Sequence, residues 1–348
     1  MPTGSMKTLR KVEVGKETTK GTAVAATELL YAQAEIDPDG YEVARGESSI
    51  GTMVKNAGPV ALVKKGVSGR LRTDPNVGAT YQQLAWWLAL ALDQPTSVAG
   101  PPPVHTFDPG TAAPWNPHSA TGRFRWTDGV TNEDLRCQYL TGSRLRLRGE
   151  RSGALQAELE FFAREQVDEA ISAAALPAIL TPILLGEAKV YINDTFALAD
   201  IHVPAAGLLA NQFKSFDLDI DVGQFPDWTI DGALTFSEAK EREKSFTLGM
   251  TLLYEPNSAV AGVAAERVKA ASTTQPKPMR FVTIAFTGPG NMKLRLVVAG
   301  HHERGEIGPP KADIDGLDSV EVPIVGHHDP TGAVLVKAVI TNDDAAAL

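Results

Sequence analysis

The sequence contains one cysteine, Cys137, in 348 residues. A single cysteine excludes an intramolecular disulfide and a cysteine-rich zinc site, and it is typical of chains kept in a reducing compartment. There is no apolar run long enough to cross a bilayer, and the N-terminus lacks the apolar segment of a signal peptide. We therefore expect a chain that is made in a cytoplasm, stays soluble and does not insert into a membrane.

An excess of basic residues is also missing. The chain has 33 Lys and Arg against 42 Asp and Glu, which gives a formal net charge of −9. A protein that grips nucleic acid through its phosphates needs a basic face, so this balance argues against that class. The hydrophobic content of 43% is that of a globular protein, and the length is enough for about two domains.

Sequence motifs of the common enzyme classes are absent. The chain has no nucleophile elbow, phosphate-binding loop, dinucleotide fingerprint or H-E-x-x-H motif. The paired histidines His301-His302 and His327-His328 lie beside Gly, Asp or Pro, and neighbours on a strand face opposite sides, so we expect solvated loop histidines.

Scattered polar residues leave a hydrolase as a weak alternative. A carboxylate pair for hydrolysis could come from an acidic stretch, and a triad could begin at a histidine that neighbours Asp or Ser. Such neighbours occur by chance in any chain of this length. We expect no enzyme, no cofactor and no metal site. The residues concerned are Asp227, Asp231, Glu238, His105 with Asp108, and His118 with Ser119.

Alternation of apolar and polar residues predicts a mainly β chain with two tandem β-sandwich domains. Two stretches with helical spacing, Ala79–Leu92 and Ser258–Ala271, predict one flanking α-helix for each domain. Gly- and Pro-rich segments over 37–58 and 97–117 predict long loops. The expected divisions are an N-terminal arm at 1–26, a first domain at 27–166, a linker at 167–185, a second domain at 186–342 and a frayed tail at 343–348.

The two halves of the chain share an order of elements. Each has a strand, then a helix, then further strands and a closing hairpin, and both helices begin just after Pro-Asn, at Pro75-Asn76 and Pro256-Asn257. This order predicts an internal duplication. With two copies of one domain in a chain, n chains can make a ring of 2n domains.

The most regular alternation lies in Phe213–Phe225, FKSFDLDIDVGQF. One side of this expected strand is apolar, and the other carries Asp217, Asp219 and Asp221. The acidic side can be an ordinary solvated sheet face or a wall that repels a polyanion. In the hairpin of the first half, the simplest register places Arg144 across from Glu158.

Three stretches resemble the major tail tube proteins of long-tailed, non-contractile bacteriophages. The first is GKETTKGTAVAATELLYAQAEI, which is similar to the opening G-K-E-x-x-x-G-T run of that family. The others are AKVYINDTFALADI followed by FKSFDLDIDVG, and the C-terminal DGLDSVEVPIVGHHDPTGAVLVKAVITN. The order of the three stretches, which together span most of the chain, carries the resemblance. The matching residues of the first stretch are Gly15, Lys16, Glu17, Gly21, Thr22, Ala25 and Leu29.

The resemblance implies a β-sandwich protein whose rings stack into the phage tail tube, through which DNA passes into the host. Family members of about half this length form six-fold rings, so the resemblance and the duplication together predict a homotrimer with pseudo-six-fold symmetry. Expected partners are tape-measure, terminator and tail-tip proteins and the passing DNA, and the expected location is the virion, after assembly in the host cytoplasm. Tube proteins of contractile tails and of type VI secretion systems are related alternatives.

We expect two groups of residues to matter in such a tube. An acidic lumen would not grip DNA, and the candidate lumen-lining residues are Asp217, Asp219, Asp221, Glu158 and Glu160. Long adaptable loops would join stacked rings. A carbohydrate-binding sandwich protein, with Trp115, Trp126 and Trp228 as sugar-stacking platforms, remains an alternative. The candidate ring-stacking residues are Asp37, Gly40, Gly46, Gly51, Pro101 and Trp115.

Overall fold

The computed structural model is mainly β, with 63% strand and 7% helix, which confirms the predicted fold class. None of the helices in the described parts is long and apolar enough to span a lipid bilayer. The described residues are 9–37, 42–48, 56–64, 66–98, 100, 102–109, 115–127, 131–171, 180–195, 207–209, 212–228, 235–253, 266, 279–302, 311–312, 318–327 and 335–342.

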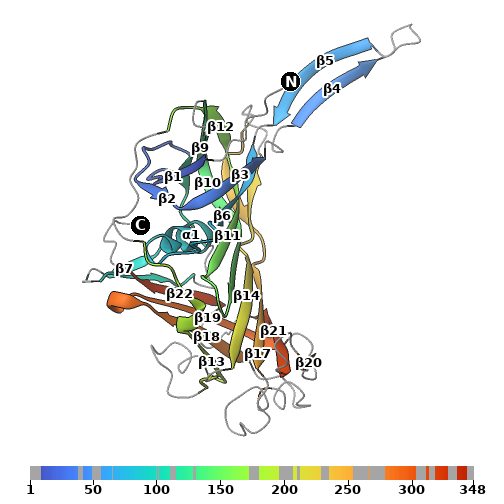
Figure 1. Cartoon of the computed structure of the whole chain (residues 1–348). Helices are drawn as coiled ribbons and strands as arrows, with labels where there is room; N and C mark the ends of the chain where they lie inside the picture. Colours follow the sequence, from blue (N-terminus) through green and yellow to red (C-terminus); the bar gives the residue numbers. More distant parts are fainter. Residues whose placement is uncertain are drawn as a thin grey trace, which may run out of the picture.

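One layer of the molecule is a continuous antiparallel sheet, which we call the long sheet (Figure 1). Both halves of the chain contribute to it, and they meet where β10 pairs with β14. In spatial order its strands are β3 (Ala32–Asp37), β6 (Val67–Thr73), β11 (Gln156–Ala163), β10 (Asn132–Glu150), β14 (Phe213–Asp221), β17 (Ser245–Leu253), β21 (Asp318–Gly326) and β20 (Lys311–Ala312).

The opposite layer consists of two shorter antiparallel sheets, and a large apolar core lies between the layers. The first short sheet has the order β2 (Glu28–Leu30), β1 (Leu9–Lys16), β9 (Ala120–Thr127), the N-terminal part of β10, and β12 (Glu165–Asp168). The second short sheet has the order β13 (Ala188–Asn193), β18 (Arg280–Thr287), β19 (Lys293–His302), β22 (Val336–Thr341), β8 (Val104–Phe107) and β7 (Thr96–Val98).

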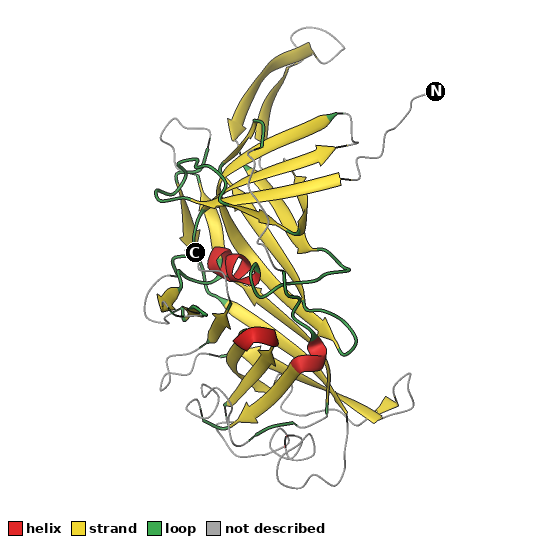
Figure 2. Cartoon of the chain, turned by 60° about the vertical axis from the view of Figure 1, so that its left-hand side comes forward, coloured by secondary structure: helices red, strands yellow, loops and turns green. Residues whose placement is uncertain are grey.

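Helix α1 (Leu84–Ala91) lies between the layers (Figure 2). All eight of its residues are buried, as expected for a helix that is apolar on every side. It is shorter than the predicted helix and is enclosed by the core instead of flanking a sheet. Gln83, just before it, accepts a hydrogen bond from the Tyr31 amide at 3.0 Å and donates to the Leu29 carbonyl at 2.9 Å. These bonds fix the helix start to the beginning of β3.

Two hairpins follow the first strand that each half gives to the long sheet. The first, β4 (Glu42–Ser48) with β5 (Asn56–Lys64), projects away from the body (Figure 1). The second is β15 (Gln224–Asp227) with β16 (Glu238–Glu241). Half of the predicted loop at 37–58 is therefore strand, and the rest lies outside the described residues: Asp37 ends β3, and Gly46 lies at a register shift in β4. Gly40, Gly51 and Pro101 lie outside the described residues.

The predicted N-terminal arm is wrong over 9–16, whereas 17–26 is turn and loop. Leu9–Lys16 forms β1, which is hydrogen-bonded on both sides, and Val12 and Val14 are fully buried. The polar residues of this stretch are typical of an exposed arm, but β1 also buries Glu13, which pairs with Lys11 at 2.6 Å. Of the predicted second helix only Glu266 is described, and it is helical. The tail at 343–348 lies outside the described residues, and the division into two domains stays a prediction.

The pairing pattern repeats along the chain. In the long sheet, β3-β6-β11-β10 of the first half corresponds to β14-β17-β21-β20 of the second. In the short sheets, β1-β9-β10-β12 corresponds to β13-β18-β19-β22. A hairpin follows β3 and β14, and helical residues follow β6 and β17. The closing hairpin of the second half, β21–β22, thus corresponds to β11–β12 and not to β10–β11 as the sequence order indicated.

The correspondence extends to single residues. Gly142 pairs with Phe161 and Thr141 with Phe162 in the first half. The matching pairs in the second half are His302 with Ile324 and His301 with Val325. The long strand β10 therefore corresponds to β19 and β20 together, which occupy the same path as two separate pieces.

Candidate functional site

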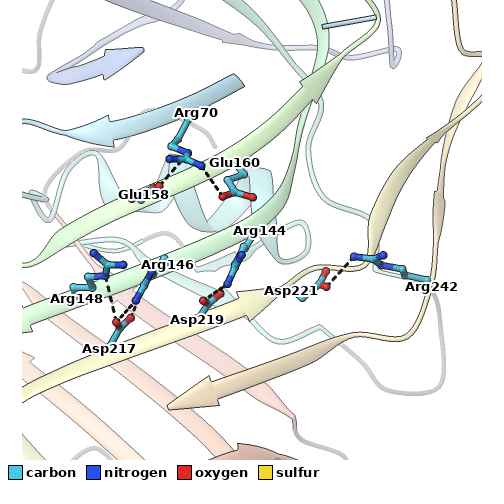
Figure 3. Close-up of polar contacts among 10 residues, drawn as sticks. All are labelled: Arg70, Arg144, Arg146, Arg148, Glu158, Glu160, Asp217, Asp219, Asp221 and Arg242. Atoms are coloured by element: carbon cyan, nitrogen blue, oxygen red, sulfur yellow. Dashed lines mark hydrogen bonds and ion pairs between the residues drawn. The ribbon is translucent and has the colours of Figure 1, made fainter. Parts of the chain in front are cut away.

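The outward face of the long sheet carries an ordered set of charged side chains. Side chains alternate across a strand, so β10 and β14 bury Leu145, Leu147, Leu218 and Ile220 on the core side. Their alternate residues point outward. We call the ion-pair face the outward side chains of Glu35, Arg70, Arg72, Glu158, Glu160, Arg144, Arg146, Arg148, Asp217, Asp219 and Asp221, with the nearby Arg242. Figure 3 shows all of them except Glu35 and Arg72.

The sign of the charge changes from strand to strand across this face. β3 contributes carboxylate, β6 guanidinium, β11 carboxylate, β10 guanidinium and β14 carboxylate. Each interior row therefore has opposite charge on both sides, within reach of cross-strand and diagonal neighbours. The sequence showed the acidic row of β14 and the basic row of β10, but only the strand order shows that they are adjacent.

The tightest contacts join β10 to β14. Arg144 holds Asp219 through two hydrogen bonds, of 2.7 and 2.5 Å, and Arg146 holds Asp217 in the same bidentate way, with its Nε at 2.8 Å. Arg148 lies 3.3 Å from Asp217. The first two of these pairs are diagonal, because the residue directly opposite Arg144 is Asp221, whereas Arg148 lies directly opposite its partner.

The predicted partner of Arg144 is therefore wrong. A register shift between Gly142 and Arg144 places Arg144 opposite Glu160 and Arg146 opposite Glu158, and both arginines turn away from β11 toward β14. The glutamates of β11 pair instead with Arg70, at 3.1 Å for Glu158 and 3.2 Å for Glu160. A bulge of this kind cannot be located from alternation alone.

The remaining contacts complete the neutralisation of the face. Arg72 lies 3.5 Å from Glu158 and 3.6 Å from Glu35, and Arg242 lies 2.9 Å from Asp221. Six carboxylates (Glu35, Glu158, Glu160, Asp217, Asp219 and Asp221) thus face six arginines (Arg70, Arg72, Arg144, Arg146, Arg148 and Arg242), a net charge of zero. The expectation that the five candidate lumen residues form an acidic wall is corrected: each of them is paired with an arginine.

Electrostatics at the centre of the face follow from these pairs. Burial alone would raise the pKa of Asp217, but the hydrogen bond from Arg146 and the charges of Arg146 and Arg148 outweigh it and hold that pKa below its usual range. The hydrogen bonds to Asp219 and Asp217 in turn raise the pKa of Arg144 and of Arg146. Asp217, Arg144 and Arg146 are therefore charged near neutral pH.

A depression of about 350 Å³ lies over the middle of the ion-pair face. Its lining holds arginine and glutamate only, with no hydroxyl, thiol or imidazole that could act as a nucleophile or base. Such a surface can interact with charged groups, yet its lining offers no reacting group. The lining residues are Arg70, Arg72, Arg144, Arg146, Arg148, Glu158 and Glu160.

The G-K-E motif has a structural role that sequence analysis missed. The buried Glu17 carboxylate accepts hydrogen bonds from the Gly21 amide at 2.7 Å, the Thr121 hydroxyl at 3.0 Å and the Tyr139 amide at 2.9 Å. Tyr139 has a φ of 54° at the irregularity where β10 passes from the first short sheet into the long sheet. Glu17 therefore stabilises the bend that lets one strand serve both layers.

The three candidate sugar-stacking tryptophans do not present open rings. Trp115 is 4% exposed, and the Lys244 ammonium lies 4.8 Å from its ring centre. Trp126 is partly buried against the core, and Trp228 packs on Phe236 at 5.8 Å. Trp115 was also a candidate for contacts between stacked rings of subunits, and its burial within the chain contradicts that role.

The expectation of solvated loop histidines is wrong for His301 and His302, whereas His327 is exposed and lies outside the strands as expected. His301 and His302 end β19, His301 contacts the ring of His327 at 4.9 Å, and His302 lies 3.5 Å from Glu266. His328 and Asp231 lie outside the described residues.

The other candidate catalytic residues have structural partners. Asp227 and Glu238 face each other in the β15–β16 hairpin and share Lys240, at 2.6 and 3.9 Å. The buried ring of His105 is 2.8 Å from the Ser97 hydroxyl, and Asp108 pairs with Lys337. Burial, with Lys16 and Lys20 nearby, lowers the pKa of His118 to about 4, while Ser119 is buried beside it.

Searching the described residues for three or more histidine, cysteine or carboxylate side chains that could share a metal ion gives no such group. No protein-family model matches the sequence, and a search of curated proteins gives no significant match.

Proposed function

We propose that this chain is a structural virion protein, which self-assembles into stacked rings that form the tail tube of a long-tailed bacteriophage. The three sequence stretches that resemble the tail tube family motivate the proposal. The observation that carries it is the duplicated pairing pattern, in which two repeats share one long sheet through the β10–β14 junction. Sheets that join edge to edge in this way extend around a ring when further repeats are added.

Three chains would give six repeats and a pseudo-six-fold ring. The β4–β5 hairpin, which projects from the body near one end, is suited to contact a neighbouring ring (Figure 1). Among the predicted stacking residues, Gly46 lies in this hairpin and Asp37 just before it. Tape-measure, terminator and tail-tip proteins would be the remaining partners of such a tube.

In this proposal the ion-pair face lines the lumen. A conduit must let DNA pass without holding it, and phosphates are held by uncompensated lysine and arginine, which displace the cations condensed on the DNA. Here the six arginines of the face are already committed to carboxylates, so the face offers little to a phosphate and does not repel it strongly either. A carboxylate lattice that neutralises its own arginines serves the same end as an acidic wall.

Negative-stain electron microscopy of the purified protein tests the proposal. We expect closed rings with six similar lobes, and tubes of stacked rings at high concentration or after warming. A protein that stays monomeric at every concentration and temperature tried would contradict it. Strong binding to particular oligosaccharides on a glycan array, without rings, would favour the carbohydrate-binding alternative.

A further inference from the structure

The long sheet ends in two strands whose outer edges are open among the described residues. At one end β3 has β6 as its one sheet partner, and at the other end β20 has β21. An open edge offers unpaired backbone amides and carbonyls to another chain. In the duplicated pattern β3 corresponds to β14, and β20 corresponds to the C-terminal part of β10.

The internal junction therefore shows how the open edges can meet. Inside the chain, the C-terminal part of β10 pairs antiparallel with β14. Their counterparts, β20 and β3, lie at opposite ends of the same sheet and cannot pair within one molecule. We propose that β20 of one copy pairs antiparallel with β3 of the next copy and repeats the β10–β14 junction between molecules. This inference rests on the proposed ring-forming function and identifies the surfaces through which the ring closes.

The register of this contact follows from the internal one. Arg148 faces Gln156 and Lys311 faces Ser319, and each is the outward pair of its ladder that lies nearest the turn. Gln156 therefore corresponds to Ser319, and Glu158, two residues further along its strand, corresponds to Glu321. The ladders then run from Glu158 through Arg72 to Gln33, and from Glu321 through Thr251 to Ser215.

Gln33 therefore corresponds to Ser215, and the next outward residue, Glu35, corresponds to Asp217. Because Arg148 is paired with Asp217 inside the chain, Lys311 is expected opposite Glu35 of the neighbouring copy. The pairs of β19 with β21 are consistent with this alignment: Phe161 lies three residues after Glu158 and pairs with Gly142, and Ile324 lies three residues after Glu321 and pairs with His302.

The charges of the two edges fit this register. Lys311 is exposed on β20, and Glu35 is 60% exposed on β3 with one long contact of 3.6 Å to Arg72. Opposite charges directly across an antiparallel pair are favourable. The contact joins different surfaces on the two copies, and a contact of this head-to-tail type closes into a ring when its rotation allows.

Disulfide trapping tests the register. Residues directly opposite in an antiparallel pair have Cα atoms about 4.5–5.5 Å apart, within the range a disulfide spans. In the doubly substituted chain, Glu35→Cys with Lys311→Cys, mild oxidation should give a ladder of covalent multimers on a non-reducing gel. Each single variant should stay monomeric on the gel. The native Cys137 does not interfere, because burial raises the pKa of its thiol to about 12.

Glu35→Cys combined with Lys189→Cys is the matched control, since Lys189 is exposed but lies on β13 in the other layer. Charge exchange gives a second readout: Lys311→Glu should raise the concentration at which rings form roughly two- to fivefold, and adding Glu35→Lys should restore it.

The outcomes separate this inference from the proposed function. Rings together with a ladder specific to the Glu35 and Lys311 pair support both. Rings without that ladder, or with an equal ladder in the Lys189 control, overturn the edge pairing and leave the tube proposal standing. A specific ladder in a protein that forms no rings or tubes upholds the edge pairing and contradicts the tube. Neither ladder nor rings overturns both.

Discussion

Removing the carboxylates of β14 should turn the ion-pair face into a DNA-binding surface. In the variant Asp217→Asn, Asp219→Asn and Asp221→Asn, the arginines Arg144, Arg146, Arg148 and Arg242 lose their partners, and the charge of the face changes from zero to +3. These arginines are 35–66% exposed, so the loss of each such surface ion pair should lower the free energy of unfolding by only about 0–1 kcal/mol. The variant should therefore fold.

The size of the gain can be worked out from counterion release. The net gain of three positive charges, taken as about three phosphate contacts, gives a slope of roughly −2.7 in log affinity against log salt, so binding should fall roughly 40-fold between 50 and 200 mM salt. The wild-type face, with its charges paired, should show no such component. Fluorescence anisotropy with a labelled duplex, repeated over a salt series, measures both quantities.

A control variant separates the local effect from net charge. Glu133→Gln, Asp168→Asn and Glu243→Gln also change the net charge from −9 to −6, but these exposed carboxylates lie outside the ion-pair face. DNA binding by the control as strong as that of the β14 variant would refute the argument, because net charge would then suffice. A β14 variant that binds no better than wild type would refute it as well.

Three further predictions concern stability, each measured by urea unfolding. Glu17→Gln places an amide N–H against one of the three groups that donate to the Glu17 carboxylate, and it should lower the free energy of unfolding by about 1–3 kcal/mol. Glu243→Gln is the control and should leave that free energy unchanged. Equal effects of the two substitutions would contradict the role of Glu17 at the β10 bend. Gly21→Ala should cost at least roughly 1–2 kcal/mol, because Gly21 has a φ of 77° and an added Cβ would lie 2.1 Å from Arg164 Nη1, while Gly186→Ala has open space and should change little. A bidentate hydrogen bond from Arg125 lowers the pKa of Asp134, so its contribution is present above the unfolded pKa of about 4 and is lost as pH falls through the lower folded pKa. The stability difference between wild type and Asp134→Asn should therefore be full near neutral pH and shrink below about pH 4; a difference that grows on acidification would contradict this sign.

Sequence patterns predicted the strands that are buried on one face. The alternation in 213–221 places β14 and its aspartates correctly. This strand was predicted because its own side chains encode which face is buried. β7 and β8 were missed for the opposite reason: they are short, lie in a Pro-rich stretch, and form only because the edge of β22 is available to pair with them.

The candidate site was predicted in its residues but not in its chemistry. The acidic row of β14 could be identified from the sequence. Its neutralisation, however, depends on β10, which pairs with β14 although the two strands are more than sixty residues apart in the sequence. The partners within that row depend further on the bulge at Gly142, where a shift of one position changes which side chains meet. The duplication likewise was visible as an order of elements, whereas its residue correspondences needed the ladders.

The β10–β14 junction also bears on how assembly would start. Inside one chain this junction forms without a second molecule, whereas a junction between chains costs an estimated 4–15 kcal/mol in lost translational and rotational freedom. A six-repeat ring built from single repeats needs five such encounters before it closes on itself, and one built from this chain needs two. The covalent link thus keeps the two repeats of each chain at a high effective concentration for every second junction of the ring. The rate at which a first ring forms should therefore depend on a lower power of the protein concentration than it would for a protein with one repeat per chain.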